Sequence, residues 1–238
     1  MVGTLAGPGL VRATAEVARW VSGQLELAEL DESRSRLAEA QVRALRAQIS
    51  PHFVYNALTA IASFVRTDSE RARELLLEFA DFTRYSSRTH GEFTTLAEEL
   101  RSIDRYLLLE HARFGDRLQV VLRVAPEVLS VAVPYRCLQP LVENAVQHGS
   151  GTVTVVAEND GAQCRISVEE DGAGSDPEWV RAILAGTAKT DSMGLANVDA
   201  RLRAVYGDEH GLLVETAVGA GTKVTLRIPK WAAGVRPS

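Results

Sequence analysis

Residues 140–149 read PLVENAVQHG, a helical pattern that carries Asn144 among its polar positions. Two further segments accompany it: VEEDGAGSD at 168–176, a strand ending in acidic residues and two glycines, and SMGLANVDARL at 192–202, a glycine turn opening a helix. A glycine turn before a helix offers unpaired backbone N–H groups and a positive dipole end, which suit a phosphate chain. An asparagine carboxamide can supply an oxygen ligand to Mg²⁺. Each segment alone is a weak signal, but their order and spacing favour a nucleotide site.

The C-terminal half around these segments has the pattern of a sheet with helices. From about Leu118 onward, short alternating or apolar runs are separated by glycine-bearing turns and helical stretches. The strand-like runs are LQVVLRV, TVTVVAE, CRISVEE, LLVETA and KVTLRI. From about Leu10 to Phe114 the chain is instead rich in Ala, Leu, Glu and Arg, with apolar residues at spacings of three and four. The fold class is therefore α+β, with a helical first half and an α/β second half.

Capping signals divide the helical half into separate helices. Residues 67–70 indicate a helix end followed by a new start, with either Asp68 or Ser69 as the N-cap. The next helix is predicted over about 71–87, and His90-Gly91 is its expected stop. These two helices are predicted to form an antiparallel hairpin. A hairpin whose helices carry apolar stripes cannot bury both of them alone, so it is expected to dimerise into a four-helix bundle.

A third helix is predicted after a capping box. Thr95 lies three residues before Glu98, which is the spacing of that motif. The helical pattern then continues through TLAEELRSIDRYLLLEHARF and ends at Phe114-Gly115, where glycine favours a helix C-terminus.

A proline and a histidine interrupt the helical pattern in QISPHFVYNAL, residues 48–58. On a helix, His52 shares a polar stripe with Asn56 one turn later. A proline inside a helix deletes one backbone hydrogen bond and costs about 3 kcal/mol, so Pro51 is predicted to bend the helix and present the imidazole outward. Neutral imidazole is nucleophilic at physiological pH, and Asn56 can bind the ring or an incoming phosphate. His52 is therefore a candidate nucleophile, the alternative being a surface histidine on a solvated face.

Composition and charge exclude several classes of protein. The 238 residues are 46% hydrophobic and 24% charged, as in ordinary globular domains. No run approaches the roughly 18 apolar residues of a spanning helix, and the start lacks the features of a signal peptide, which together predict a cytoplasmic chain. A net charge of -5 with mixed signs provides no basic stripe for nucleic acid. Cys137 and Cys164 have no metal-ligand neighbours in the sequence and are predicted to be buried free thiols.

Taken together, the motifs resemble those of LytS-type sensor histidine kinases. LRAQISPHFVYNAL is similar to the H-box pattern QxxPHFxxNxL of that family, and LAEELRSIDRYLLLEHARFGDRL resembles its connector. The ENAVQHG, DGAG and MGLANVDARL segments resemble the N, G1 and G2 boxes of the GHKL, or Bergerat-type, ATPase fold. The resemblance covers roughly residues 40–230, with four motifs in the correct order. It implies a helical hairpin that forms a dimeric four-helix bundle, followed by a two-layer α/β sandwich of the GHKL type.

The resemblance also implies a function, an ATP-dependent protein-histidine kinase of a two-component system. ATP and Mg²⁺ would be its cofactors, and His52 would be autophosphorylated before the phosphoryl group passes to an aspartate of a response regulator. The expected partners are a second copy of the chain and that receiver domain, with an upstream sensor module that this chain does not contain. The implied domains are a helical linker over 1–36, the dimerisation, phosphoacceptor and connector helices over 37–114, an ATP-binding domain over 115–232, and a tail over 233–238.

Individual residues take roles from the matching boxes. Asn144 becomes the Mg²⁺ ligand, while Gly172 and Gly174 shape the wall of the adenine pocket. A short lid over the nucleotide is expected from about 177 to 191. The remaining residues of the implied nucleotide site are His148 and Glu170, with Gly194, Leu195 and Asn197 at the phosphates and Thr222 near the adenine.

The chain departs from the family pattern at two positions. The G1 box normally begins with aspartate, where this chain has Glu170, so one extra methylene must be accommodated. The G2 box often begins with glycine, where this chain has Ser192. Many other histidine kinases have an acidic residue directly after the histidine, where this chain has Phe53. Glu143 is the nearest carboxylate in the motifs, and it either polarises the imidazole or water as a catalytic group or only pairs on its own helix.

Two alternative functions remain open at this stage. Glu170 and Ser192 would suit a catalytically weak or inactive dimeric scaffold of the same fold, which would not bind ATP. A GHKL ATPase without a phosphohistidine is the weaker alternative, because such enzymes place a water-activating glutamate four residues before the Mg²⁺ asparagine and this chain has Pro140 there.

Overall fold

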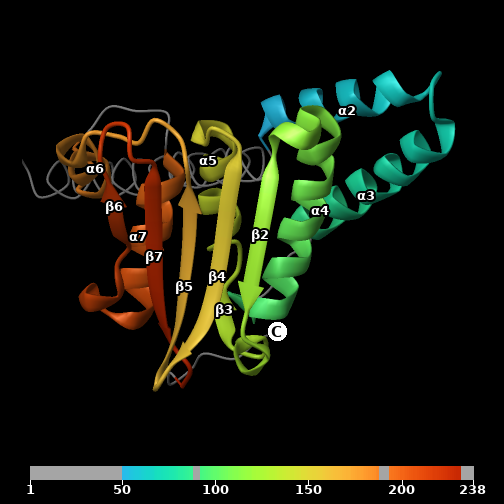
Figure 1. Ribbon diagram of the computed structural model, residues 1–238. Coiled ribbons are helices and arrows are strands. Elements are labelled where there is room, and N and C mark those ends of the chain that lie inside the picture. The colour runs from blue at the N-terminus through green and yellow to red at the C-terminus, as the bar shows by residue number, and fades with distance from the viewer. Residues whose placement is uncertain (1–49, 88–91, 188–192, 232–238) are drawn as a thin grey trace, which may run out of the picture. The chain divides into compact units, whose positions relative to one another are not determined.

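Figure 1 shows the computed structural model, which describes residues 50–87, 92–187 and 193–231. The chain divides into two compact units, Met1–Ser50 and Pro51–Ser238, and the second contains all the helices and strands described below. The linker predicted over 1–36, the stop at His90-Gly91 and the tail over 233–238 lie outside the described residues.

The first two helices of this unit form the predicted hairpin. α2 (Pro51–Phe64) and α3 (Ser69–Ser87) contact each other and are joined by residues 65–68. Asp68 is the N-cap of α3, because its Oδ1 accepts a hydrogen bond from the backbone N–H of Arg71 at 3.0 Å. That bond satisfies one of the amide donors that a helix start leaves without a partner, and it decides between the two candidate caps.

Pro51 is the first residue of α2, and Ser50 before it is not helical. The first helical position suits proline, because an N–H there would have no partner within the helix and the fixed φ of proline is already helical. For the described residues, the prediction that Pro51 bends the interior of a continuous helix is therefore wrong. His52 is exposed, as predicted, but because it lies in the first turn of α2.

α4 (Leu96–Phe114) follows with the predicted capping box at its start. Thr95 Oγ1 accepts a hydrogen bond from Glu98 N at 3.2 Å, and Glu98 Oε2 accepts one from Thr95 N at 3.4 Å. The helix ends at Gly115, whose φ of 59° is in the region that glycine adopts easily. Both ends of this helix were therefore readable from local sequence.

The three helices share an aromatic core. The ring centroid of Phe53 on α2 lies 5.0 Å from that of Phe82 on α3 and 5.1 Å from that of Tyr106 on α4. Such tilted ring pairs add to the stabilisation that the buried apolar area provides. The first turn of α2 is thus held against α4, which matters for the surroundings of His52.

A five-stranded sheet in the order β2-β4-β5-β7-β6 forms the second part of the unit. β2 pairs in parallel with β4, and the other neighbouring strands are antiparallel. All five strands that the sequence predicts are present: β2 (Gln119–Val124), β4 (Thr152–Asp160), β5 (Gln163–Glu170), β6 (Leu213–Thr216) and β7 (Thr222–Pro229).

A separate pair of strands, β1 (Phe93–Thr95) and β3 (Ala132–Pro134), was not predicted. Each has only three residues, too few for an alternating pattern to be recognised. Among the described residues, 3₁₀ turns complete the connections at Gly115–Arg117, Pro126–Val128 and Asp208–His210.

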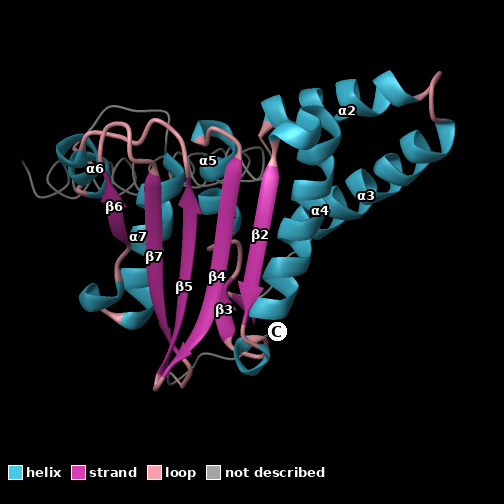
Figure 2. Cartoon of the chain, in the orientation of Figure 1, coloured by secondary structure: helices cyan, strands magenta, loops and turns pink. Residues whose placement is uncertain are grey.

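Helices α5 (Gln139–His148) and α7 (Met193–Tyr206) lie on one face of the sheet (Figure 2). α5 contacts β4 and β5, and α7 contacts α5 and α6 (Pro177–Leu184). Burial alternates along β4 and β5, so one face of each strand contributes to the core between sheet and helices. The α+β fold with a two-layer α/β sandwich is confirmed.

The two cysteines are free and buried, as predicted. Burial raises the pKa of the Cys164 thiol to about 11, so it is protonated at neutral pH. In the parts of the chain that the structure describes, no helix is both long and apolar enough to cross a membrane.

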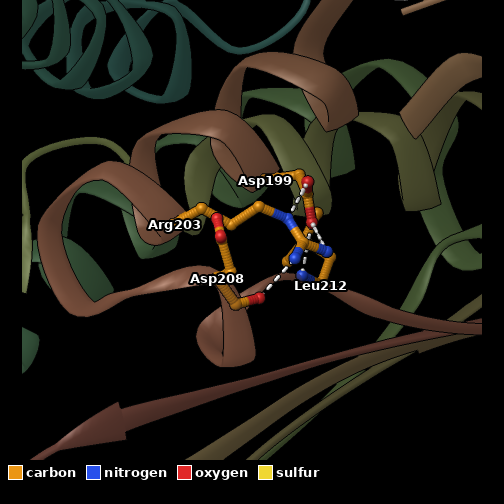
Figure 3. Close-up of polar contacts among 4 residues, drawn as sticks. All are labelled: Asp199, Arg203, Asp208 and Leu212. Carbon is orange, nitrogen blue, oxygen red and sulfur yellow. Dashed lines mark hydrogen bonds and ion pairs between the residues drawn. The ribbon is translucent and has the colours of Figure 1, made fainter. Parts of the chain in front are cut away.

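A buried carboxylate in the middle of α7 binds the residue that precedes β6 (Figure 3). Asp199 is 4% exposed, and its Oδ1 accepts a hydrogen bond from Leu212 N at 2.7 Å. Its Oδ2 accepts one from Arg203 Nε at 2.7 Å, and the same guanidinium donates to the carbonyl of Asp208. One side chain thereby orders the turn between the last helix and the final strands.

We expect Asp199→Ala to destabilise the fold by about 1–3 kcal/mol, because the buried amide of Leu212 loses its acceptor. Urea unfolding followed by circular dichroism would measure the loss. Arg203→Gln is the matched control, since it removes the exposed partner and leaves the bond to Leu212 intact. Equal destabilisation by both variants would contradict this assignment.

Candidate active site

A cavity of about 270 Å³ opens between α5, α6, α7 and the strands β5, β6 and β7. It brings together six residues that the sequence analysis assigned to one site: Asn144, His148, Glu170, Gly174, Leu195 and Thr222. Most of the remaining wall is apolar, from Leu141, Val168, Val180, Ile183, Val214 and Val224. An apolar cavity with a few polar groups is the usual form of a small-molecule site.

Glu170 and Thr222 form a polar patch in this apolar wall. Glu170 is the last residue of β5, is 6% exposed, and is the direct cross-strand partner of Thr222 on β7. Its Oε2 accepts a hydrogen bond from the backbone N–H of Gly172. Thr222 Oγ1 lies 3.1 Å from Thr216 Oγ1. The longer side chain of glutamate therefore fits at this position and directs its carboxylate to the cavity.

Asp171 faces away from the cavity, as the alternation along a strand predicts. Its Oδ1 accepts hydrogen bonds from Ser150 N at 3.1 Å and from Thr152 N at 3.0 Å. These bonds, with that of Thr152 the largest cause, lower the pKa of the Asp171 carboxyl. Glu170 thus lines the cavity, whereas its neighbour Asp171 orders the loop that follows α5.

The glycines of the G1 segment allow close contacts that a side chain would prevent. A Cβ on Gly172 would overlap the carbonyl oxygen of His148, the last residue of α5. A Cβ on Gly174 would overlap the carbonyl oxygen of Ala217, and Gly174 also has a φ of +63°. Both glycines therefore pack the loop after β5 against its neighbours and hold Glu170 in place.

Asn144 lies on the α5 side of the cavity, next to the start of α7. A Cβ built on Gly194 would lie 3.4 Å from Pro140 Cβ and 3.9 Å from Asn144 Nδ2. Gly194 is already within α7, which is described from Met193 onward, so the expectation that it lies in a turn before the helix is corrected. Ser192 lies outside the described residues.

His52 is a second site, away from this cavity. Asn56 Nδ2 lies 3.2 Å from Nδ1 and 3.3 Å from Nε2 of the His52 imidazole, as the four-residue spacing predicts. Neither residue is among those that line the cavity in the described part of the chain. One compact unit therefore contains both an exposed histidine, which contacts the Asn56 side chain, and an apolar cavity with a few polar groups.

Two family models match this chain. The first, Histidine kinase, matches residues 40–118, and the second, Histidine kinase-, DNA gyrase B-, and HSP90-like ATPase, matches residues 130–232. The chain is also 36% identical over 219 residues to the sensor protein LytS of Enterococcus faecalis, covering 87% of this chain and 37% of that protein. The chain therefore matches a histidine kinase model in its helical half and a related ATPase model in its second half, and it is similar to the LytS-type sensor histidine kinases.

Other sensor histidine kinases are similar to this chain over most of its length. The sensor histidine kinases YpdA and BtsS of Escherichia coli K12 are 35% and 32% identical over 216 and 219 residues, covering 88% and 90% of this chain. The chain spans 37–38% of the length of these relatives. Among solved structures, the catalytic domain of the histidine kinase ThkA matches with a TM-score of 0.46 and 24% identity, over 59% of this chain and 99% of that one.

Besides His52 and Asn56, four residues assigned to the site do not line the cavity: Gly172, Gly194, Asn197 and Glu143. Asn197 is exposed on α7. Glu143 is directed toward α4 instead: its Oε1 accepts a hydrogen bond from Gln139 Nε2 at 2.7 Å, and its charge acts on the pKa of Tyr106 and Glu110. Burial raises the pKa of the Glu143 carboxyl. The hydrogen bond from Gln139 lies within its own helix, which matches the pairing alternative.

The position of α5, and hence of Asn144, depends on a carboxylate that the sequence analysis missed. Glu99 on α4 is 1% exposed and accepts hydrogen bonds from Arg136 N at 2.9 Å, Leu138 N at 3.1 Å and Gln139 N at 3.3 Å. Burial raises the pKa of this carboxyl, and the three bonds oppose that rise. Because its partners lie 37 to 40 residues away, no local pattern could reveal them.

Helix α6 was also missed as part of the cavity wall. The sequence does contain the start signal of this helix, an N-cap residue followed by proline. Asp176 accepts a hydrogen bond from Glu178 N at 2.8 Å, and Pro177 occupies the first turn. Trp179, which is 47% exposed, lines the cavity from this helix. The helix occupies the first part of the segment expected to cover a nucleotide.

Proposed function

We propose that this chain is the kinase core of a two-component sensor histidine kinase, which transfers the γ-phosphoryl group of ATP to His52. The observation that supports this most strongly is the cavity that combines the carboxylate of Glu170 with the carboxamide of Asn144, in the same compact unit as the exposed His52. Phosphoryl transfer of this kind depends mainly on positioning and charge neutralisation, for which such a cavity is suited.

The residues present fit ATP. The cavity of about 270 Å³ is slightly smaller than the range of about 300–1,000 Å³ usual for small-molecule sites, which suits the nucleoside, with the phosphates extending toward α7. Apolar walls suit a purine ring. Glu170 Oε1 is the oxygen that would accept from the adenine amino group, since Oε2 binds Gly172 N.

The residues also fit Mg²⁺ bound in the way this ion prefers. The described residues contain no group of three His, Cys, Asp or Glu side chains that could hold a metal ion. Mg²⁺ commonly keeps several waters and binds one or two protein groups together with substrate phosphates. Asn144 would be the protein ligand. Gly194 beside it, together with Leu195, leaves space for phosphates at the start of α7.

The wider assignments rest on similarity to the family. We propose a homodimer formed through α2 and α3, a response-regulator receiver domain as the partner that accepts the phosphoryl group, and a sensor module upstream. A kinase that uses ATP and a receiver domain works in the cytoplasm. The domain boundaries proposed from sequence, 1–36, 37–114, 115–232 and 233–238, are retained as part of this proposal.

Radiolabelled ATP tests this function. We expect the purified chain with Mg²⁺ and [γ-³²P]ATP to acquire a label that is lost in acid and stable in base, the behaviour of a phosphohistidine. Calorimetry with ATP should show binding, and Glu170→Asp should bind with similar affinity because the present glutamate already fits. Absence of both binding and label would favour the inactive scaffold, and a label stable in acid would contradict transfer to a histidine.

A further inference from the structure

Glu110, a buried carboxylate on α4, has no part in the nucleotide cavity. It is 4% exposed, and its Oε2 lies 3.4 Å from Nη1 of Arg113 one turn later. Burial of a carboxylate is unfavourable unless a partner compensates for the lost water. Arg113 is itself partly exposed, so its ion pair compensates only weakly for the water that Glu110 loses. If this position served only packing, an apolar side chain would be more stable there.

The packing of α2 on α4 places the first turn of α2, which carries His52, against the helix that carries Glu110. Phe53, the next residue after His52, has its ring centroid 5.1 Å from that of Tyr106. Glu110 lies four residues after Tyr106 and therefore on the same face of α4. The first turn of α2 is thus seated against the turns of α4 that carry Tyr106 and Glu110.

The two groups also interact electrostatically. Burial is the largest influence and raises the pKa of the Glu110 carboxyl, while Arg113 on α4 and His52 on α2 lower it and Glu143 on α5 raises it. Ionisable groups on three helices thus influence this one carboxyl. His52 is the only member of this group that can act as a nucleophile toward phosphorus.

We propose that Glu110 is a positioning residue for His52: its carboxylate accepts a hydrogen bond from one ring N–H, directly or through one water, and so keeps the other ring nitrogen unprotonated for attack on phosphorus. A carboxylate that holds an imidazole in one tautomer and stabilises its cationic form is an established arrangement in other enzymes. Many other histidine kinases have an acidic residue directly after the histidine, where this chain has Phe53. Glu110 would supply that acidic group from another helix. This inference rests on the proposed function.

The transfer step balances with Glu110 in this role. The unprotonated ring nitrogen forms a bond to the γ-phosphorus as the bond from that phosphorus to the bridging oxygen breaks, and ADP leaves with the electron pair. The ring becomes cationic, and the carboxylate of Glu110 stabilises that charge. The proton on the other ring nitrogen then passes to the carboxylate or to water. No redox partner is needed.

Glu110→Gln tests the proposal, because glutamine keeps the shape of the side chain but cannot accept the proton. We expect the rate of His52 labelling from ATP to fall by about 100-fold or more, in the range of general acid–base effects. ATP affinity and the unfolding midpoint should stay at the wild-type values. Asp104→Asn is the matched control: it removes another carboxyl from α4, one whose pKa burial also raises, and should label at the wild-type rate.

Two readouts separate this inference from the proposed function. Phosphoramidate phosphorylates histidine without the nucleotide cavity, so Glu110→Gln should slow that reaction as well. A long-range ¹H–¹⁵N spectrum of the protein alone should show one dominant His52 tautomer in the wild type and a mixture in Glu110→Gln. If wild type is not labelled by ATP but these two differences appear, the proposed function fails and the inference stands. Unchanged phosphoramidate labelling and tautomer, or an equal loss of stability and ATP affinity, would overturn the role of Glu110.

Discussion

His52→Gln is expected to abolish the acid-labile label from ATP while leaving ATP binding at the wild-type affinity. The imidazole is the only group at this position that can attack phosphorus, and a carboxamide cannot replace it. The cavity residues are not among the contacts of His52, so nucleotide binding should be independent of it. Because the side chain is exposed, the free energy of unfolding should change by less than about 0.5 kcal/mol.

Filter-bound radioactivity after base treatment would measure the label, and calorimetry would measure binding. His111→Gln is the matched control, because His111 is also an exposed histidine of this unit and does not line the cavity. It should be labelled as the wild type is. Equal labelling of wild type and His52→Gln would place the phosphoryl group elsewhere and remove the basis for the proposed mechanism.

Gly174→Ala is expected to reduce ATP affinity by at least about tenfold and to destabilise the fold. The left-handed backbone costs an alanine about 1–2 kcal/mol, and its Cβ would also overlap the carbonyl oxygen of Ala217 and lie 2.9 Å from that of Gly221. Both neighbours are backbone atoms, so they cannot move aside as a flexible side chain would. The loop that holds Glu170 would have to shift, and the cavity would change shape with it.

Gly161→Ala separates strain from overlap. Gly161 has nearly the same φ, +62°, but a Cβ there would meet nothing within 4 Å, and it lies in the turn between β4 and β5, at the opposite end of β5 from Glu170. It should lose only the stability due to the backbone and bind ATP as the wild type does. Thermal unfolding and calorimetry on both variants provide the comparison. If the two variants lost stability and affinity equally, the close approach at Gly174 would have no functional role.

Local signals predicted the elements well where the physical cause was itself local. The capping box of Thr95 and Glu98 starts α4 as expected, since both partners lie within four residues. Pro51 was misjudged because composition alone shows a continuous helical pattern around it, and only the backbone shows that a helix starts there. The short strands β1 and β3 were missed because three residues carry too little pattern, and pairing between distant segments creates them.

The candidate site was predictable for the residues that lie in motifs. Asn144, Glu170, Gly174 and Thr222 come together as expected, because each motif ends a strand or carries a helix that points to the same region. Glu143 was placed on the correct helix but faces α4, since the direction of a helical side chain depends on what packs against it. Trp179 joined the cavity through α6, whose docking no local pattern describes.

The sequence by itself determined the α+β class, the family, the exposed His52 with Asn56, and the set of motif residues at the cavity. The fold class and the exposed histidine follow from periodicity, caps and spacing, which act over a few residues, whereas the family and the cavity residues follow from the resemblance of the motifs. Only the tertiary structure decided which groups surround the buried carboxylates: the backbone amides at the start of α5 for Glu99, and charged groups of three helices, His52 among them, for Glu110. Burial and electrostatic contact arise between helices that are distant in the chain, and they exist only once those helices have packed.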